Sequence, residues 1–383
     1  MAKRPEHFPW DIPDSCFDAP EFWVAGLAEC ERFLRALPEV EVSEIGRSAG
    51  GRPLLAATLG EREPIARTST SLSSSMGGVG LAGWDPDKWR PASFYGPERG
   101  KPVLVIQGNL HGSEIACTVA AMNLLNLAVR GTDLRGRENE PLRRAVRALR
   151  LVVIPHANPD GRARWEPARQ LEDCTKEQAQ RVTQGRLADG TPLAWPSCKS
   201  LFPLPPGGLL GAYYNDAGVN LNHDRFLDAD RAPETDALLR FYLEEMPDAA
   251  VLAHTDMGTL LGGPPPFVPE EIQGVHHRIA GAVAAEVRRR GLPVFSYPHF
   301  ARAGGMSRAF TQPDAVYHQC GATPLLVEFA QSTDGHRLSF DTILDVGMAV
   351  LETIILYGLE IGFRPALRKH LADGRTVTAY GPL

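Results

Sequence analysis

The stretch from Pro102 to Glu114 reads PVLVIQGNLHGSE. Its apolar run, Val103 to Gln107, predicts a buried strand, and the mostly apolar run from Ile115 to Val129 predicts the helix that follows. The turn between them holds His111 and Glu114, two good ligands for a divalent metal ion. Open α/β sheets gather their chemistry at such strand-to-helix turns. Taken alone, the pair also fits a simpler interpretation, a polar turn with a Glu on the first helical turn, where the macrodipole favours it.

Other apolar runs alternate with helical patterns along the chain. Within residues 41–59, two runs that carry apolar residues flank a glycine-rich turn, which predicts a hairpin at a sheet edge. Three further continuous apolar runs predict strands: Leu151 to Pro155, Ala249 to Ala253 and Pro324 to Phe329. Helical spacing falls at roughly 22–37, 232–246, 269–290 and 339–361. Strands alternating with helices predict an α/β fold with a mixed, mainly parallel central sheet flanked by helices.

The chain is expected to divide into three parts. Residues 1–40 form an N-terminal lead-in and helix, 41–363 a catalytic domain, and 364–383 a C-terminal tail. Residues 162–217 show no clear periodicity and are interpreted as a long insertion that covers the site, with a partner-binding surface as the alternative.

Charge and composition narrow the function classes. The net charge of −6 over 383 residues, without a basic stripe, gives no electrostatic case for a nucleic-acid partner. The first fifteen residues lack the apolar core of a secretory signal, and no uninterrupted apolar stretch reaches the length of a membrane span. We therefore expect a cytoplasmic protein without a membrane partner. The six cysteines show no CxxC pairing, which favours reduced thiols.

Two residues far along the chain complete a candidate catalytic site. His254 follows an apolar strand, as His111 does, so two imidazoles and Glu114 could meet at neighbouring strand ends. Two His and one carboxylate are the ligand set of a catalytic zinc with an open position for water. Glu328, inside the apolar strand PLLVEFA, is the candidate general base. The alternative interpretations are that His254 is only a hydrogen-bonded histidine at a strand end and that the side chain of Glu328 points to solvent.

The order of the motifs resembles that of the zinc metallocarboxypeptidase family over roughly residues 40–360. GRSAGGRPLLAATLG is followed by NLHGSE, NPDG, GVNLN, AHTD and LLVEFA. The resemblance implies a carboxypeptidase-like α/β fold and a Zn²⁺ ion held by His111, Glu114 and His254. It also implies that Glu328 acts as general base when water attacks an amide carbonyl.

The substrate side of the site departs from the family pattern. The resemblance places Asn222 among the residues that bind the terminal carboxylate of a peptide, but His223 stands where the family has Arg, and Arg225 lies two residues later. A guanidinium grips a carboxylate bidentately, whereas a histidine can be neutral at pH 7. Asn220 replaces the Asp that usually orients a zinc-binding His; its amide oxygen can still accept from the ring N–H.

The resemblance also implies an arginine downstream of NPDG that stabilises the oxyanion. Arg162, Arg164 and Arg169 are near, and we favour Arg164, with Arg169 second. The family's substrate-closing Tyr would fall at residues 305–311, which contain no Tyr, and Tyr317 is out of register. That hydroxyl is therefore either supplied from elsewhere or absent.

These observations predict a single-domain zinc hydrolase that cleaves an amide bond. The leading hypothesis is a carboxypeptidase acting on a small peptide, with a cell-wall-derived one as an option. The first alternative is an amidase or deacylase of an N-acyl amino acid or other non-peptide amide. The second is a non-catalytic zinc-bearing binding protein, against which the presence of Glu328 argues. The sequence does not determine the oligomeric state.

Overall fold

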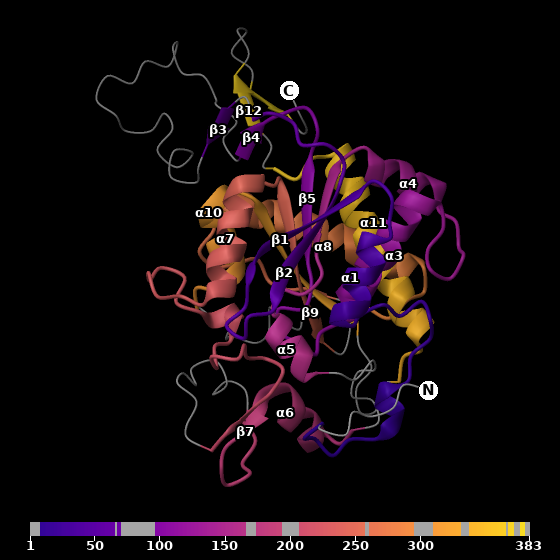
Figure 1. Ribbon diagram of the computed structural model, residues 1–383. Coiled ribbons are helices and arrows are strands. Elements are labelled where there is room, and N and C mark those ends of the chain that lie inside the picture. Colours follow the sequence, from indigo (N-terminus) through magenta and orange to yellow (C-terminus); the bar gives the residue numbers. More distant parts are fainter. Residues whose placement is uncertain are drawn as a thin grey trace.

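Seven strands form one sheet in the order β1-β2-β6-β5-β9-β11-β10. Figure 1 shows the computed structural model, which describes residues 8–65, 67–69, 96–165, 174–193, 207–256, 260–294, 309–330, 337–364, 367–370 and 376–379. In the order along the chain, the strands of this sheet are β1 (Val40–Arg47), β2 (Pro53–Leu59), β5 (Val103–Gln107), β6 (Arg150–Ile154), β9 (Ala249–Asp256), β10 (Leu260–Leu261) and β11 (Thr323–Ala330).

The four central strands, β6, β5, β9 and β11, run parallel to one another. The outer pairs, β1 with β2, β2 with β6 and β10 with β11, are antiparallel. This is the predicted mixed sheet with a parallel centre. Its interior strands come from the continuous apolar runs because a strand covered on both faces has no polar face. Three two-stranded pairs lie outside this sheet: β3 (Arg67–Ser69) with β4 (Gly96–Glu98), β7 (Gly185–Arg186) with β8 (Leu209–Leu210), and β12 (Leu367–His370) with β13 (Thr376–Ala379).

Helices cover both faces of the sheet (Figure 1). One face packs against α1 (Leu27–Arg35), α3 (Ala116–Arg130), α4 (Glu140–Arg147), α8 (Glu270–Arg289) and α11 (Phe340–Glu360), and the other against α7 (Pro233–Glu245) and α10 (Gln312–Cys320). The alternation along each strand divides the two cores. In β5, Leu104 and Ile106 enter the first core, whereas Val103 and Val105 enter the second. The shorter helices are η1 (Asp14–Phe17), α5 (Pro159–Arg164), α6 (Lys176–Gln184) and η3 (Leu221–His223).

Several helices differ from the sequence-based expectation, which did not include α4, α5 or α10. Helix α1 begins at Leu27 instead of Phe22, because the Glu29 carboxylate accepts from the N–H groups of Ala25 and Gly26 and so fixes the start of the helix. The stretch without periodicity contains α6, whose polar sequence hides it from a search for apolar spacing.

A third, smaller core joins the N-terminal segment to the insertion. Phe8, Trp10, Ile12 and Phe17 pack with residues of the 162–217 stretch, which are Trp165, Cys174, Val182 and Ala212. The Sγ atoms of Cys16 and Cys174 lie 4.0 Å apart, too far for a disulfide bond between them. The lead-in and the insertion, far apart in sequence, therefore share one apolar cluster.

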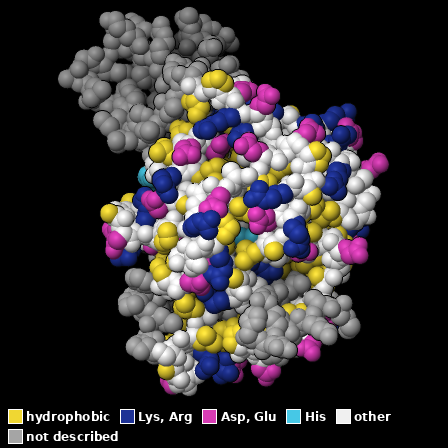
Figure 2. All heavy atoms as spheres, viewed as in Figure 1, with side chains coloured by type: hydrophobic (Ala, Val, Ile, Leu, Met, Phe, Trp, Pro, Cys, Tyr) yellow, Lys and Arg dark blue, Asp and Glu magenta, His cyan; other side chains and the backbone are white. Residues whose placement is uncertain are grey.

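Helix α11 is long and apolar enough to cross a membrane, which the sequence analysis did not expect. Within this fold, 67% of its apolar window is buried, and it packs against α3, α8 and β11. A helix that is apolar on most sides suits the centre of a large core. On the face drawn in Figure 2, Lys and Arg side chains are interspersed with Asp and Glu, without a large patch of one sign.

Candidate metal centre

His111 and Glu114 lie in the turn between β5 and α3, at the carboxyl edge of the parallel strands. Both side chains are buried, and Nδ1 of His111 is 2.9 Å from Oε1 of Glu114. The backbone N–H of Glu114 donates to the His111 carbonyl, which closes the turn. Glu114 precedes α3 by two residues, so the expectation that it lies on the first helical turn is wrong. It is nevertheless held by a tight turn at the end of a central strand.

His254 completes a three-residue cluster from β9. Its Nδ1 atom is 3.0 Å from Oε2 of Glu114, and the ligand atoms of the three side chains lie within 4.8 Å of one another. Tetrahedral zinc with bonds of about 2.1 Å needs donor atoms roughly 3.4 Å apart. The two His–Glu distances are within a few tenths of an ångström of that spacing. The donor set and its convergence therefore fit a zinc ion.

The charges of the cluster suit a cation. Burial acts to raise the pKa of Glu114, but the neighbouring His111 and His254 outweigh it and lower that pKa to about 2. Burial likewise acts to lower the pKa of His254, and the carboxylates of Glu114 and Glu328 raise it above the usual value. The site thus holds an ionised carboxylate between two imidazoles.

Asn220 orients the His111 ring, as expected from the sequence. Its Oδ1 atom lies 3.2 Å from Nε2 of His111 and also accepts from the N–H of Asn222. With Nε2–H donating to Asn220, the lone pair of Nδ1 points toward Glu114 and is available to a metal.

Asn109 and His156 support the same turn, and the sequence analysis assigned neither to the site. Asn109 has φ of 57°, a left-handed conformation that Asn tolerates better than most residues. Its Nδ2 group donates to the His111 carbonyl, and its Oδ1 atom lies 2.9 Å from Nδ1 of His156. Burial and nearby Arg162 lower the pKa of His156 to about 3, so its ring is neutral and donates from Nδ1. The feature of the sequence that could have indicated this support was Asn109 itself, because Asn adopts a left-handed conformation in a turn more readily than most residues.

The insertion also reaches the turn between β5 and α3, residues 108–115, which we call the metal turn. The Ala212 carbonyl accepts from the N–H of Gly112, and the ring of Tyr213 stacks on the His111 imidazole with centroids 3.9 Å apart and planes 10° apart. A Cβ atom on Gly112 would lie 2.0 Å from the carbonyl carbon of Gly161. Only glycine at position 112 permits this close approach. The sequence analysis treated the insertion as a cover and did not identify Tyr213.

Glu328 lies on β11 next to His254. The two residues are register partners in the parallel β9–β11 pair, so their side chains point to the same face of the sheet. That face is the one covered by α7 and α10. The side chain of Glu328 is half-buried, and its charge contributes to the raised pKa of His254. Its assignment as general base stays a prediction, with a position that suits it.

The predicted substrate-binding residues have varied surroundings. Asn222 lies in η3 beside Asn220, and its Oδ1 atom is buried without a hydrogen-bond partner among the described residues. His223 is the last residue of η3 and is half-buried. Arg225 is exposed, and its guanidinium pairs with the carboxylate of Asp230 at 2.7 Å.

The arginines proposed for the oxyanion are engaged elsewhere or lie outside the described residues. Arg164 donates to the Tyr214 and Gly211 carbonyls and pairs with Asp216. Arg169 falls outside the described residues. The catalytic role of Arg164 and the substrate role of Arg169 remain predictions.

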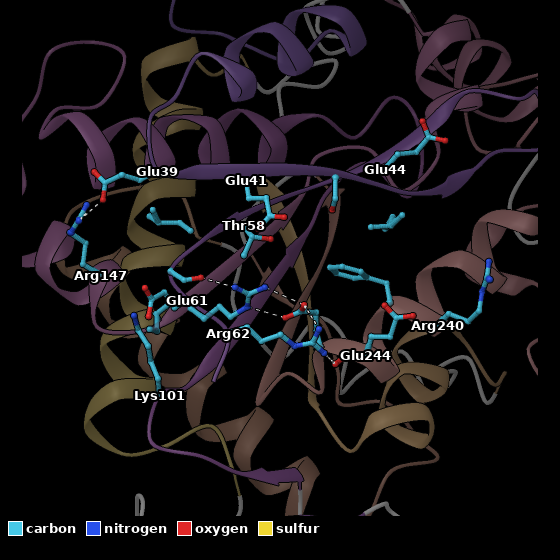
Figure 3. Close-up of a pocket in the computed structure, with 18 of the residues that line it drawn as sticks. Glu39, Glu41, Glu44, Thr58, Glu61, Arg62, Lys101, Arg147, Arg240 and Glu244 are labelled. Carbon is cyan, nitrogen blue, oxygen red and sulfur yellow. Dashed lines mark hydrogen bonds and ion pairs between the residues drawn. The ribbon is translucent and has the colours of Figure 1, made fainter. Parts of the chain in front are cut away.

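A groove of about 1030 Å³ lies away from the metal cluster (Figure 3). It is lined by β1, β2, the end of α7 and Lys101, which precedes β5, so it opens at the amino end of the parallel strands. Several of its charged groups neutralise each other, as in the pairs Glu39 with Arg147 and Arg150 with Glu245. The groove is therefore separate from the candidate active site.

Comparisons with known proteins agree with this geometry. The model of the zinc carboxypeptidase family matches residues 27–246, a stretch that includes His111, Glu114 and Asn220. No curated protein matches the sequence.

Solved structures share the fold. A metallo-carboxypeptidase from Burkholderia cenocepacia superposes with a TM-score of 0.52 and 18% identity, over 86% of this chain and 67% of that one. A metallo-carboxypeptidase from Pseudomonas aeruginosa, in complex with (2-guanidinoethylmercapto)succinic acid, has a TM-score of 0.50 and 14% identity, over 86% of this chain and 67% of that one. Bovine thrombin-activatable fibrinolysis inhibitor, in complex with tick carboxypeptidase inhibitor, has a TM-score of 0.50 and 10% identity, over 88% of this chain and 98% of that one. The chain thus spans about two thirds of the two bacterial structures.

Proposed function

The chain belongs to the zinc carboxypeptidase family, and from that premise we propose that it removes the C-terminal residue of a small peptide, with Glu328 as general base. The observation that carries the proposal is the convergence of His111, Glu114 and His254 beside the strand position of Glu328. A site built only to hold a metal has no use for a carboxylate at that place.

In the proposed reaction the protein positions water and moves protons. Zinc, when held by His111, Glu114 and His254, supplies a Lewis acid that acidifies water and polarises the scissile carbonyl. Glu328 accepts a proton from the attacking water and passes it to the nitrogen of the leaving amine. Asn220 keeps the His111 ring in the tautomer that leaves Nδ1 for the metal. Arg164, or Arg169, is the proposed donor to the oxyanion.

The substrate end of the proposal is a short peptide whose carboxylate meets Asn222 and His223. Asn222 would donate to that carboxylate from Nδ2, because an amide oxygen only accepts; its buried, unpartnered Oδ1 atom is open to a donor such as a peptide N–H. A cell-wall-derived peptide in the cytoplasm is the substrate we favour, because the carboxylate clamp is altered from the family pattern. No disulfide joins any two of the five described cysteines, which supports a reducing compartment.

One observation favours a second candidate, an amidase or deacylase of a non-peptide amide. Arg225, the residue that could replace the missing family arginine, is exposed and paired with Asp230. A substrate without a free α-carboxylate would not need that guanidinium.

The test combines zinc content with hydrolysis of a peptide panel, each peptide carrying a free or an amidated C-terminus. Wild-type protein is compared with Glu328→Gln and with Glu271→Gln, an exposed acidic control on α8. We expect one zinc per chain, cleavage only of free C-termini, and a loss of about 10²–10⁴-fold in kcat for Glu328→Gln alone.

Other outcomes distinguish the alternatives. Cleavage of amidated or N-acylated compounds in preference to free peptides would replace the carboxypeptidase with the amidase. Stoichiometric zinc without turnover of any amide would leave a binding protein. A well-folded sample that takes up no zinc would overturn the catalytic proposal.

A further inference from the structure

Tyr213 of the insertion covers one face of a zinc ligand. Its ring lies parallel to the His111 imidazole at a centroid distance of 3.9 Å, while His254 meets that imidazole at 63° with centroids 4.8 Å apart. We propose that Tyr213 is a positioning residue of the metal centre, which holds His111 in the plane where Nδ1 meets the metal. The proposal rests on the zinc site of the proposed function and assigns the 162–217 insertion a part in it.

Two contacts in the plane of the His111 ring hold its nitrogens, and Tyr213 adds a contact on its face. The contacts of Nδ1 with Glu114 and of Nε2 with Asn220 define a line through the ring. The bond from Cγ to the backbone limits rotation about that line, but contacts of this kind tolerate angular deviations of some tens of degrees, so the ring can still tilt slightly. A flat partner stacked on its face opposes the tilt, and stacked aromatic pairs are favourable when their rings are offset. Tyr213 therefore narrows the range of ring orientations that the two in-plane contacts allow.

Tyr213 is itself held by main-chain contacts on both sides. Its N–H donates to the Thr183 carbonyl at 2.9 Å, and its carbonyl accepts from Nδ2 of Asn158 at 3.4 Å. The preceding residue, Ala212, donates to the Val182 carbonyl and accepts from the N–H of Gly112 at 2.8 Å. The stacked ring thus projects from a backbone anchored both to α6 and to the metal turn.

Glycines make this approach possible. A Cβ atom on Gly161 would lie 2.3 Å from the Ala212 carbonyl oxygen, and one on Gly112 would lie 2.3 Å from the nitrogen of Arg162. Neither position could hold a side chain without moving the backbone. The metal turn, the start of α5 and the insertion are therefore packed backbone against backbone, and Tyr213 lies at their junction.

The experiment measures zinc affinity directly, by competition with a chromophoric chelator, and does not depend on turnover. Tyr213→Phe keeps the flat ring, Tyr213→Leu keeps apolar bulk without it, and Tyr213→Ala removes both. Val182→Ala is the matched control, since Val182 is a buried residue of the insertion whose side chain belongs to the cluster with Trp165, and Tyr213 packs against a different cluster. We expect Phe to bind zinc within about twofold of wild type, and Leu and Ala to lose about tenfold or more.

A spectroscopic readout separates positioning from loss of folding. In the Co²⁺-substituted protein, the visible d–d bands should shift in Tyr213→Leu and not in Tyr213→Phe or Val182→Ala, because only the first substitution alters the ligand geometry. Leu and Phe variants that bind zinc equally would overturn the proposal. So would an equal loss of affinity in Val182→Ala, since a general loosening of the insertion would then suffice. If zinc affinity is retained in Tyr213→Phe and lost in Tyr213→Leu while no peptide is cleaved, the positioning role of Tyr213 is supported and the carboxypeptidase activity is rejected. The two proposals can therefore fail separately.

Discussion

At the scale of single residues, the support of His111 depends on a neutral amide. Asn220 accepts from Nε2–H through Oδ1, a position at which a carboxylate would make the imidazole a more basic ligand. The neutral acceptor therefore holds the ring in place while giving the metal less charge support.

Substitutions of Asn220 should separate orientation from charge. Asn220→Ala is expected to lower zinc affinity by about 10–100-fold, because His111 loses the acceptor that fixes its tautomer. Asn220→Asp should bind zinc at least as tightly as wild type, since a carboxylate accepts the same hydrogen bond with more charge. Chelator competition at pH 7 measures both. Equal affinity in the Ala variant would show that the hydrogen bond is dispensable.

At the scale of elements, the Asp160 carboxylate joins three segments. The side chain is fully buried in α5, where it accepts from Ser48 Oγ, the N–H of Gly50 and the Arg52 guanidinium. It also accepts from the N–H of Asp216 in the insertion. One carboxylate therefore ties the turn between β1 and β2 to the insertion.

Asp160→Asn should lower the free energy of unfolding by about 3 kcal/mol, because a buried charged acceptor with several donors is lost. Asp216→Asn, which alters a more exposed partner of Arg52, should cost less. Burial acts to raise the pKa of Asp160, and its hydrogen bonds lower it below the usual value. Its stabilisation is therefore complete above the unfolded-state pKa and is lost as pH falls toward the lower folded-state pKa. Urea unfolding at a series of acidic pH values checks this. If the free energy of unfolding of Asp160→Asn fell with decreasing pH as steeply as that of the wild type, the expectation would be contradicted.

Elements differ in how far the sequence predicts them. The central strands were predictable because a run such as LVVIP has one low-energy environment, the interior of a parallel sheet. Helix α6 was not, because its sequence KEQAQRVTQ has no apolar stripe. A capping box of Thr175 and Gln178 was the local signal that remained.

The three residues of the candidate metal cluster and the contact of Asn220 with His111 were predictable from the order of the motifs, whereas the contacts of Tyr213 and Asp160 were not. Tyr213 and Asp160 act on partners 102 and 108–112 residues away. No periodicity or motif spacing reports which distant backbone will lie against a turn. The Tyr213 contact depends on the glycine packing at Gly112 and Gly161, which only the folded chain reveals.

At the scale of the whole molecule, the fold should survive loss of the metal. Glu114 is within hydrogen-bonding distance of both imidazoles, so the cluster has internal partners when no ion is present. We expect a chelator to abolish hydrolysis, leave the far-UV circular dichroism unchanged and lower Tm, since a ligand that binds only the native state stabilises it by mass action. Restored zinc should recover both activity and Tm. A chelated sample that unfolds at room temperature would contradict the expectation.

The apolar cluster shared by the lead-in and the insertion has a consequence for the order of synthesis. Phe8, Trp10 and Phe17 leave the ribosome about 150 residues before Trp165, their partner in that cluster. At the usual rates of translation this gap is roughly 8–30 s. During that interval several large apolar side chains lack their native cover, which makes the nascent N-terminal segment a natural client for a chaperone.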